Sequence, residues 1–177
     1  ALKHAETTLK NHFRKDHSSY HVVSYNNDGT VETKCTHQGK SDDSSWARGQ
    51  AWAVYGYTSC YRESKNPVFL KQAEDVAALI MTRVKTDDSV PLWDYDAPDT
   101  LETPRDASAA SITASALIEL GTLAKDGQVY LDYAEKLLKS LSSDTYLAKV
   151  GTNRGFILMH STGSLPNGSE IDTPINY

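Results

Sequence analysis

Residues 106–141 read DASAASITASALIELGTLAKDGQVYLDYAEKLLKSL, and this stretch predicts two helices joined by a short turn. Asp106 stands where a helix N-cap is expected, and the turn falls at Lys125, Asp126 and Gly127. Apolar residues recur at helical spacing on both sides of that turn. The predicted buried faces are Ala109, Ile112, Ala116, Leu117 and Leu120 before the turn, and Tyr130, Tyr133, Ala134, Leu137, Leu138 and Leu141 after it. The stretch therefore predicts a helical hairpin.

Apolar residues recur at helical spacing in three segments upstream as well. A second helix is expected from about Ser45 or Trp46 to Tyr61, and a third starts at Asn66 and Pro67, a cap followed by a first-turn proline. The stripe of the first segment is Leu2, Ala5, Leu9 and Phe13, and that of the third is Phe69, Leu70, Ala73, Val76, Ala77, Ile80 and Val84. These segments predict further paired helices.

Two kinds of segment interrupt the helices. Residues 20–33 place aromatic and β-branched residues around Asp28-Gly29, which predicts a β-hairpin. Residues 36–45, 86–105 and those after Ser143 lack periodicity and are expected to be loops. Helical hairpins with long loops at some ends and short turns at others predict an all-α fold, an α/α toroid with one short β-hairpin. A helical bundle stays open as the alternative, because no sequence repeat is visible.

Composition limits the function. The chain has 177 residues, 39% hydrophobic and 23% charged, which suits one folded domain covering residues 1–177. The net charge of -5 argues against a nucleic-acid partner, and no apolar run is long enough to span a membrane. Cys35 and Cys60 lack metal-ligand spacing, and their pairing is left open. Nothing in the sequence calls for a metal or an organic cofactor.

The stretch HQGKSDDSSWARGQAW, residues 37–52, carries the strongest chemical signal. If the helix begins near Ser45, then Ser45, Arg48 and Trp52 share one face. A guanidinium can clamp a carboxylate and an indole offers a flat platform for a sugar ring, so this face suits an anionic sugar. The alternative is that Trp52 belongs to the core and Arg48 pairs with Asp42 or Asp43.

Each of the other candidates has a structural alternative, evenly balanced for the loop at 91–98 and favoured for Asp106 and His21. Residues 91–98, PLWDYDAP, interleave aromatics with carboxylates as a sugar site does, or they form a proline-fixed loop pinned to the helices. Asp106 is a helix cap, or otherwise a catalytic acid. His21 in a strand is a structural hydrogen-bonding group or a base. His160 and Ser161 do not make a serine hydrolase, because no nucleophile elbow is present.

Taken together, these motifs resemble the unsaturated glucuronyl hydrolases of glycoside hydrolase family 88. The resemblance covers almost the whole chain, and its most specific part is WARGQAW, residues 46–52. The matching stretches are YHVV at 20–23, HQG at 37–39, SSWARGQAW at 44–52, WDYDAP at 93–98, RDASAA at 105–110, HSTG at 160–163 and GSEID at 168–172.

The resemblance implies an (α/α)6 barrel that removes a 4,5-unsaturated uronic acid from oligosaccharides left by polysaccharide lyases. Such enzymes hydrate the C4=C5 vinyl ether, with an aspartate as the acid and base. The positions that match the family's substrate pocket are His21, Gln38, Arg48 and Trp52, and Ser45 and Trp46 lie in the same block. Lys40 replaces an expected aromatic residue, a change that either favours a more anionic substrate or has no effect.

The resemblance also implies an absence. The family's key aspartates belong to its N-terminal half, one of them in an Asp-Asn motif, and this chain contains no Asp-Asn pair. We therefore expect the C-terminal half of the barrel, truncated at both ends, with substrate-recognition residues and no catalytic residue. Alone it should be inactive, and it should self-associate or associate with the N-terminal half. The alternatives are an unsaturated rhamnogalacturonyl hydrolase and a non-catalytic carbohydrate-binding or scaffold fragment.

Overall fold

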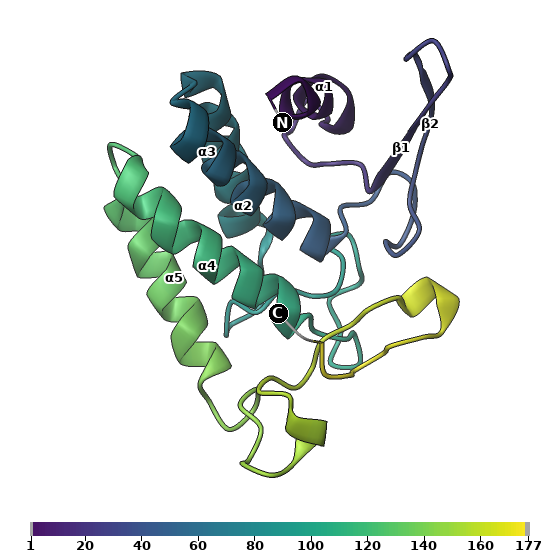
Figure 1. Ribbon diagram of the computed structural model, residues 1–177. Coiled ribbons are helices and arrows are strands. Elements are labelled where there is room, and N and C mark those ends of the chain that lie inside the picture. Colours follow the sequence, from purple (N-terminus) through teal and green to yellow (C-terminus); the bar gives the residue numbers. More distant parts are fainter. Residues whose placement is uncertain (1, 176–177) are drawn as a thin grey trace.

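The computed structural model describes residues 2–175, and the ends of the predicted domain, Ala1, Asn176 and Tyr177, lie outside the described residues (Figure 1). The predicted all-α fold with one β-hairpin is confirmed. The elements are α1 (Leu2–His12), β1 (Val22–Tyr25), β2 (Val31–Cys35), α2 (Ala47–Ser64), α3 (Pro67–Arg83), α4 (Ala107–Leu123) and α5 (Gln128–Leu141), with short 3₁₀ turns at Asn153–Gly155 and Leu165–Asn167.

The helices form two hairpins that pack side by side through α2 and α4, while α1 packs against α2 (Figure 1). Local sequence explains each connection. Lys65 ends α2 in the left-handed conformation, and the Asn66 side chain accepts a hydrogen bond from Val68 N while Pro67 opens α3. Asp106 caps α4 in the same way through Ser108 N and Ala109 N. Both predicted caps are confirmed.

The core lies between α2, α3 and α4. Phe69, Val76 and Ile80 of α3 meet Val54 of α2 and Leu117 of α4, all of them buried. The predicted faces of α3 and α4 are confirmed, with Leu70 and Val84 only partly buried at the edge.

Two residues of the predicted stripes are exposed. Leu138 is 44% exposed, because α5 contacts α4 through the stripe that contains Ala134 and Leu137, and Leu138 projects beside it. Leu2 is 52% exposed at the start of α1, whose buried contact is Ala5. Burial therefore follows a narrower stripe than hydrophobicity alone predicts.

The β-hairpin pairs Val22 with Cys35 and Tyr25 with Val31, and its register shifts between Ser24 and Tyr25. Asp28 accepts hydrogen bonds from the backbone N–H and hydroxyl of Thr30 in the turn. Gly29 has a φ of 84°, which a side chain would disfavour. The pairing of Cys35 and Cys60 was left open by the sequence, and both thiols are free.

The long loops meet where α2 and α4 begin (Figure 1). Ala47 N donates to Trp93 O, Asp106 N donates to Pro91 O, and Ala107 N donates to His160 O. Two segments distant in sequence, residues 91–93 and His160, are therefore fixed around the same two helix N-termini.

The turn between α4 and α5 depends on a close backbone approach. A Cβ at Gly127 would lie 1.8 Å from the Gly121 carbonyl oxygen, although a φ of -66° suits any residue. We expect Gly127→Ala to lower the free energy of unfolding by about 1–3 kcal/mol, as overpacking does. The control is Gly56→Ala in α2, where no atom lies within 4 Å. The free energy of unfolding of Gly56→Ala should rise by about 0.5–1 kcal/mol, because alanine has the higher helix propensity. Urea unfolding measures both, and equal effects would contradict the packing argument.

Candidate functional site

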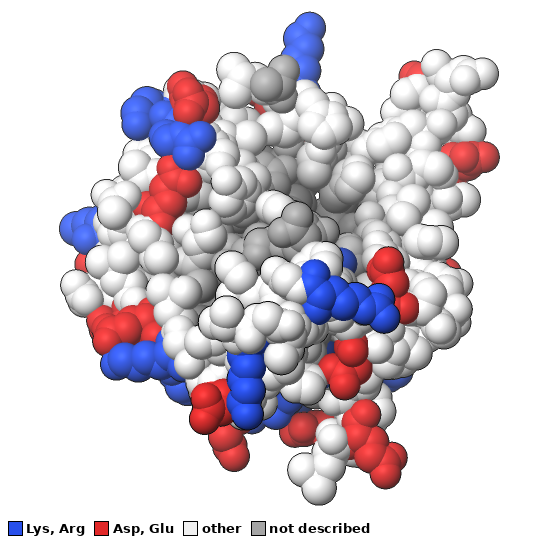
Figure 2. All heavy atoms as spheres, turned by 60° about the horizontal axis from the view of Figure 1, so that its bottom comes forward, with Lys and Arg blue, Asp and Glu red and all other residues white. Residues whose placement is uncertain are grey.

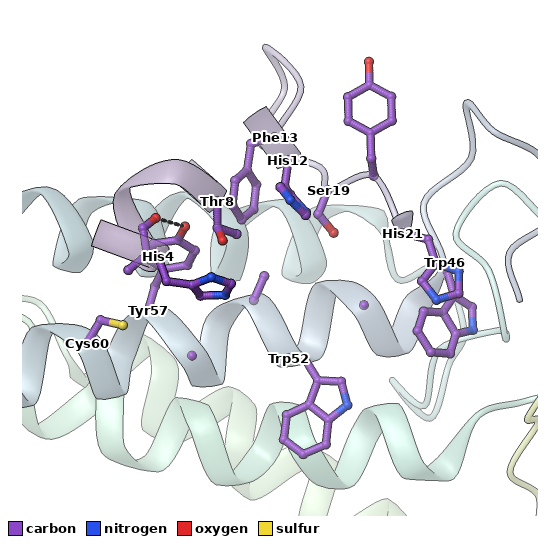
Figure 3. Close-up of a pocket in the computed structure, with 15 residues that line it drawn as sticks. His4, Thr8, His12, Phe13, Ser19, His21, Trp46, Trp52, Tyr57 and Cys60 are labelled. Carbon is purple, nitrogen blue, oxygen red and sulfur yellow. Dashed lines mark hydrogen bonds between the residues drawn. The ribbon is translucent and has the colours of Figure 1, made fainter. Parts of the chain in front are cut away.

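A cavity of about 390 Å³, called the site cavity below, opens between α1, α2 and the segment leading into β1 (Figure 3). His21 and Trp46 line one end, His4 and Cys60 lie toward the other, and Trp52 lies between them along α2 (Figure 3). The part of the lining that α2 supplies includes three small residues, Gly49, Ala53 and Gly56. The cavity thus brings together three of the six predicted site residues.

His21 is held as a neutral imidazole at this end of the cavity. Its Nδ1 accepts hydrogen bonds from the backbone N–H groups of His37 (3.1 Å) and Gln38 (3.2 Å). The Thr36 hydroxyl lies 3.3 Å from the same nitrogen. Burial lowers the pKa of His21 below its ordinary value of 6.5, and the charges of His37 and Arg48 lower it further. The proton therefore sits on Nε2, which makes His21 a hydrogen-bond donor there.

Two indoles belong to the aromatic lining, which also contains Phe13, Tyr20 and Tyr57. The Trp46 ring stacks on His21, with centroids 4.4 Å apart, and is 8% exposed. Trp52 is 40% exposed and meets Tyr55 edge-on at 5.7 Å. The alternative that Trp52 belongs to the core is therefore wrong, and part of its indole faces the cavity.

Arg48 lies behind this lining in a buried ion pair. It is 4% exposed, and its Nη2 lies 3.2 Å from Oδ2 of the fully buried Asp106. The alternative that Arg48 pairs with Asp42 or Asp43 is wrong in its partner, because Asp106 comes from the opposite hairpin. The Arg48 guanidinium also donates to the Thr162 carbonyl and lies 5.2 Å from the Trp46 ring.

The predicted shared face of Ser45, Arg48 and Trp52 does not form one open surface. The helix begins at Ala47, so Ser45 precedes it, and Ser45 is 1% exposed. The Ser45 hydroxyl accepts a hydrogen bond from Arg83 Nη1 at 2.9 Å. Ser45 and Arg48 are therefore buried while Trp52 faces the cavity.

Gln38 connects the cavity to the end of the chain. Its Nε2 donates to the Gly163 carbonyl at 2.7 Å. Its backbone N–H is one of the two N–H groups that donate to His21 Nδ1. Residues 160–164, called the tail segment below, are thus held at successive carbonyls by Arg48 and Gln38. Sequence periodicity gave no sign of this contact; the only signal was the matching stretch HSTG.

Asp106 combines two roles. Its Oδ1 accepts from Ser108 N and Ala109 N, which confirms the cap, and its Oδ2 accepts from Arg48. Burial raises the pKa of Asp106, while the Arg48 charge and the Ser108 hydrogen bond oppose that rise. Asp106 is 0% exposed and does not line the site cavity, so the geometry favours the cap over a catalytic acid.

The geometry of the loop at 91–98 favours the structural alternative, a loop pinned to the helices, over a sugar site. Trp93 is 5% exposed and Asp94 is fully buried, where Asp94 accepts hydrogen bonds from Lys40 N, Ser44 Oγ and Asp96 N. The Lys40 ammonium donates to the Asp96 carbonyl at 2.7 Å, so this loop holds it on the surface. The loop therefore braces the start of α2.

Figure 2 shows Lys, Arg, Asp and Glu in mixed groups on the face that it draws, without a continuous patch of one sign. Within residues 2–175, no group of three or more His, Cys, Asp or Glu is placed to hold a metal ion. None of the described helices has the length and apolar character needed to cross a membrane.

No family model matches the chain, but individual proteins do. The whole chain is 50% identical to 44% of an unsaturated glucuronyl hydrolase from Formosa agariphila. The solved structure of an unsaturated glucuronyl hydrolase specific for heparin matches with a TM-score of 0.96 and 55% identity, over 99% of this chain and 48% of that one. A Streptococcus agalactiae unsaturated glucuronyl hydrolase variant complexed with dGlcA-GalNAc6S matches with a TM-score of 0.84 and 28% identity, over 97% of this chain and 46% of that one.

These likenesses confirm the resemblance drawn from the motifs and the predicted α/α-barrel fold class. The chain spans about half the length of the curated relatives it matches, as their C-terminal half.

The buried histidine predicts a pH dependence of stability. A pKa held below 6.5 in the folded state means that the unfolded chain binds more protons at mildly acidic pH, so stability falls as the pH drops below about 6.5. The pKa of His12 is also lowered, mainly by burial, so His12 changes stability with pH in the same direction. Urea unfolding between about pH 5 and 8 should show a shallower slope for His21→Gln than for wild type. The shallowest slope is expected for His12→Gln/His21→Gln, and an unchanged slope for His21→Gln would contradict the lowered pKa of His21.

Proposed function

In sequence and fold this chain belongs with the unsaturated glucuronyl hydrolases, about half of whose length it matches, and on that premise we propose that the protein hydrolyses unsaturated uronic-acid oligosaccharides. The reaction is hydration of the C4=C5 double bond of a terminal 4,5-unsaturated uronic acid, after which the product opens and releases the next sugar. The observation that carries the proposal is the site cavity, whose lining includes both His21 and Trp52.

The cavity offers what a sugar of this kind needs. The exposed Trp52 indole can cover one face of the ring, and the His21 Nε2–H can donate to a hydroxyl or a carboxylate. The Arg48 guanidinium lies next to the Trp46 ring. Because Arg48 is paired with Asp106, its charge attracts an anion only at short range. Recognition thus rests on stacking and directed hydrogen bonds.

The proton donor is assigned elsewhere. Protonating a vinyl ether carbon needs a positioned acid, and among the described residues neither aspartate nor glutamate lines the site cavity. We therefore assign recognition to this part of the protein and the acid to the remainder of the barrel. This agrees with the missing Asp-Asn pair and leaves Asp94 and Asp106 as structural groups.

The substrate class is an unsaturated glycosaminoglycan disaccharide. The full-length protein carrying this sequence is incubated with unsaturated disaccharides from heparin, from chondroitin and from rhamnogalacturonan, and the loss of double-bond absorbance is followed. We expect loss with a glycosaminoglycan disaccharide. Loss with the rhamnogalacturonan product alone would favour the related family, and binding without loss would favour a carbohydrate-binding role.

Arg48 should matter to turnover far more than Arg62. Arg48→Ala removes the guanidinium beside the cavity and leaves Asp106 buried without its ion-pair partner, so we expect about 1.5–3 kcal/mol less transition-state stabilisation. Arg62 lies exposed at the end of α2, paired with Glu63 and Glu119, and its loss should change kcat/KM by less than about twofold.

The measurement is kcat/KM in the full-length protein, with circular dichroism to establish that each variant is folded. Arg48→Lys provides a second variant if Arg48→Ala does not fold. Equal kinetics for the Arg48 and Arg62 variants would remove Arg48 from the site.

A further inference from the structure

Asp106 meets Arg48 in a geometry that fixes the guanidinium plane. Oδ2 accepts from both Nε and Nη2 of Arg48, each at 3.2 Å, and neither side chain has appreciable exposure. Two donors on one oxygen fix the position of the planar group, and the Thr162 carbonyl, as a second acceptor, restricts its rotation. The pair joins the first turn of α2 to the residue that precedes α4.

The two carboxylate oxygens have separate partners. Oδ1 accepts from Ser108 N at 3.2 Å, from the Ser108 hydroxyl at 2.5 Å and from Ala109 N at 3.4 Å, all of which belong to the start of α4. Only Oδ2 faces Arg48. The capping of the helix and the orientation of the arginine can therefore be separated by substitution, because asparagine also caps helices but carries no charge.

The tail segment is fastened at the same place. Arg48 donates to Thr162 O, Ser108 N donates to Ser161 Oγ at 3.1 Å, and Thr162 Oγ1 donates to Arg105 O at 2.9 Å. The next carbonyl, Gly163 O, accepts from Gln38, whose backbone N–H contacts His21 Nδ1. A continuous series of hydrogen bonds thus runs from Asp106 through Arg48 and the tail segment to the histidine of the site cavity.

We propose that Asp106 is a positioning residue for the reaction: its Oδ2 orients Arg48, and through Arg48 it fixes the tail segment and Gln38 beside His21. The inference rests on the proposed function, since it supposes that Arg48 and His21 serve substrate binding. It assigns to Asp106 a role distinct from its helix cap.

The test is a double-mutant cycle in the full-length protein, with kcat and KM measured for the unsaturated disaccharide that the wild type consumes. Asp106→Asn keeps the cap and should lower kcat/KM about 10- to 100-fold, the size of effect expected from misplacing a site group. In an Arg48→Gln background the same change should cost less than about twofold, because the charge to be oriented is gone. The cap control is Asn66→Ala, which removes the equivalent cap of α3 far from the site and should leave kcat/KM unchanged.

The outcomes separate the claims. Wild-type kinetics for Asp106→Asn, in an enzyme that Arg48→Gln impairs, would overturn the inference and leave the proposed function standing. Equal losses from Asp106→Asn in both backgrounds would also overturn it, because that is the result of a purely structural role. A wild-type protein that consumes none of the disaccharides would overturn the proposed function and this inference with it.

Discussion

The buried ion pair between Arg48 and Asp106 is the contact around which the loop end of this molecule is arranged. Removing both charges from water is costly, and the cost is offset only when every remaining donor and acceptor is paired. Here the cap donors of α4 and the Thr162 carbonyl complete the pairing. These bonds join α2, α4 and the tail segment, and through Gln38 they hold the tail segment beside His21 of the site lining.

The helices were predictable because their signals are local. Asn66-Pro67 and Asp106 mark helix starts through bonds that span two or three residues, and the apolar stripes of α3 and α4 repeat within one element. Leu138 and Leu2 were assigned wrongly because periodicity does not say how wide the contact with the neighbouring helix is. The β-hairpin was found from its turn, where Asp28 and Gly29 carry the signal.

The site was only partly predictable. Motif resemblance singled out His21 and Trp52, and the structure brings both to one cavity. The partners of Arg48 lie 58 and 114 residues away, and the partner of Gln38 lies 125 residues away. No spacing rule reaches that far, so the alternative considered from the sequence paired Arg48 with the nearby Asp42 or Asp43. The tail segment lacks periodicity because hydrogen bonds to distant side chains, and not an apolar stripe, fix its path.

The same separation in sequence sets an order of assembly. Each helical hairpin is closed by neighbours in the chain, so α2–α3 and then α4–α5 can form while the polypeptide is still being synthesised. The Gln38 side chain finds its acceptor only once residue 163 has been made. Until then the guanidinium of Arg48 has the Asp106 carboxylate but not the Thr162 carbonyl. The recognition surface is therefore completed after the residues of the helical hairpins have been made.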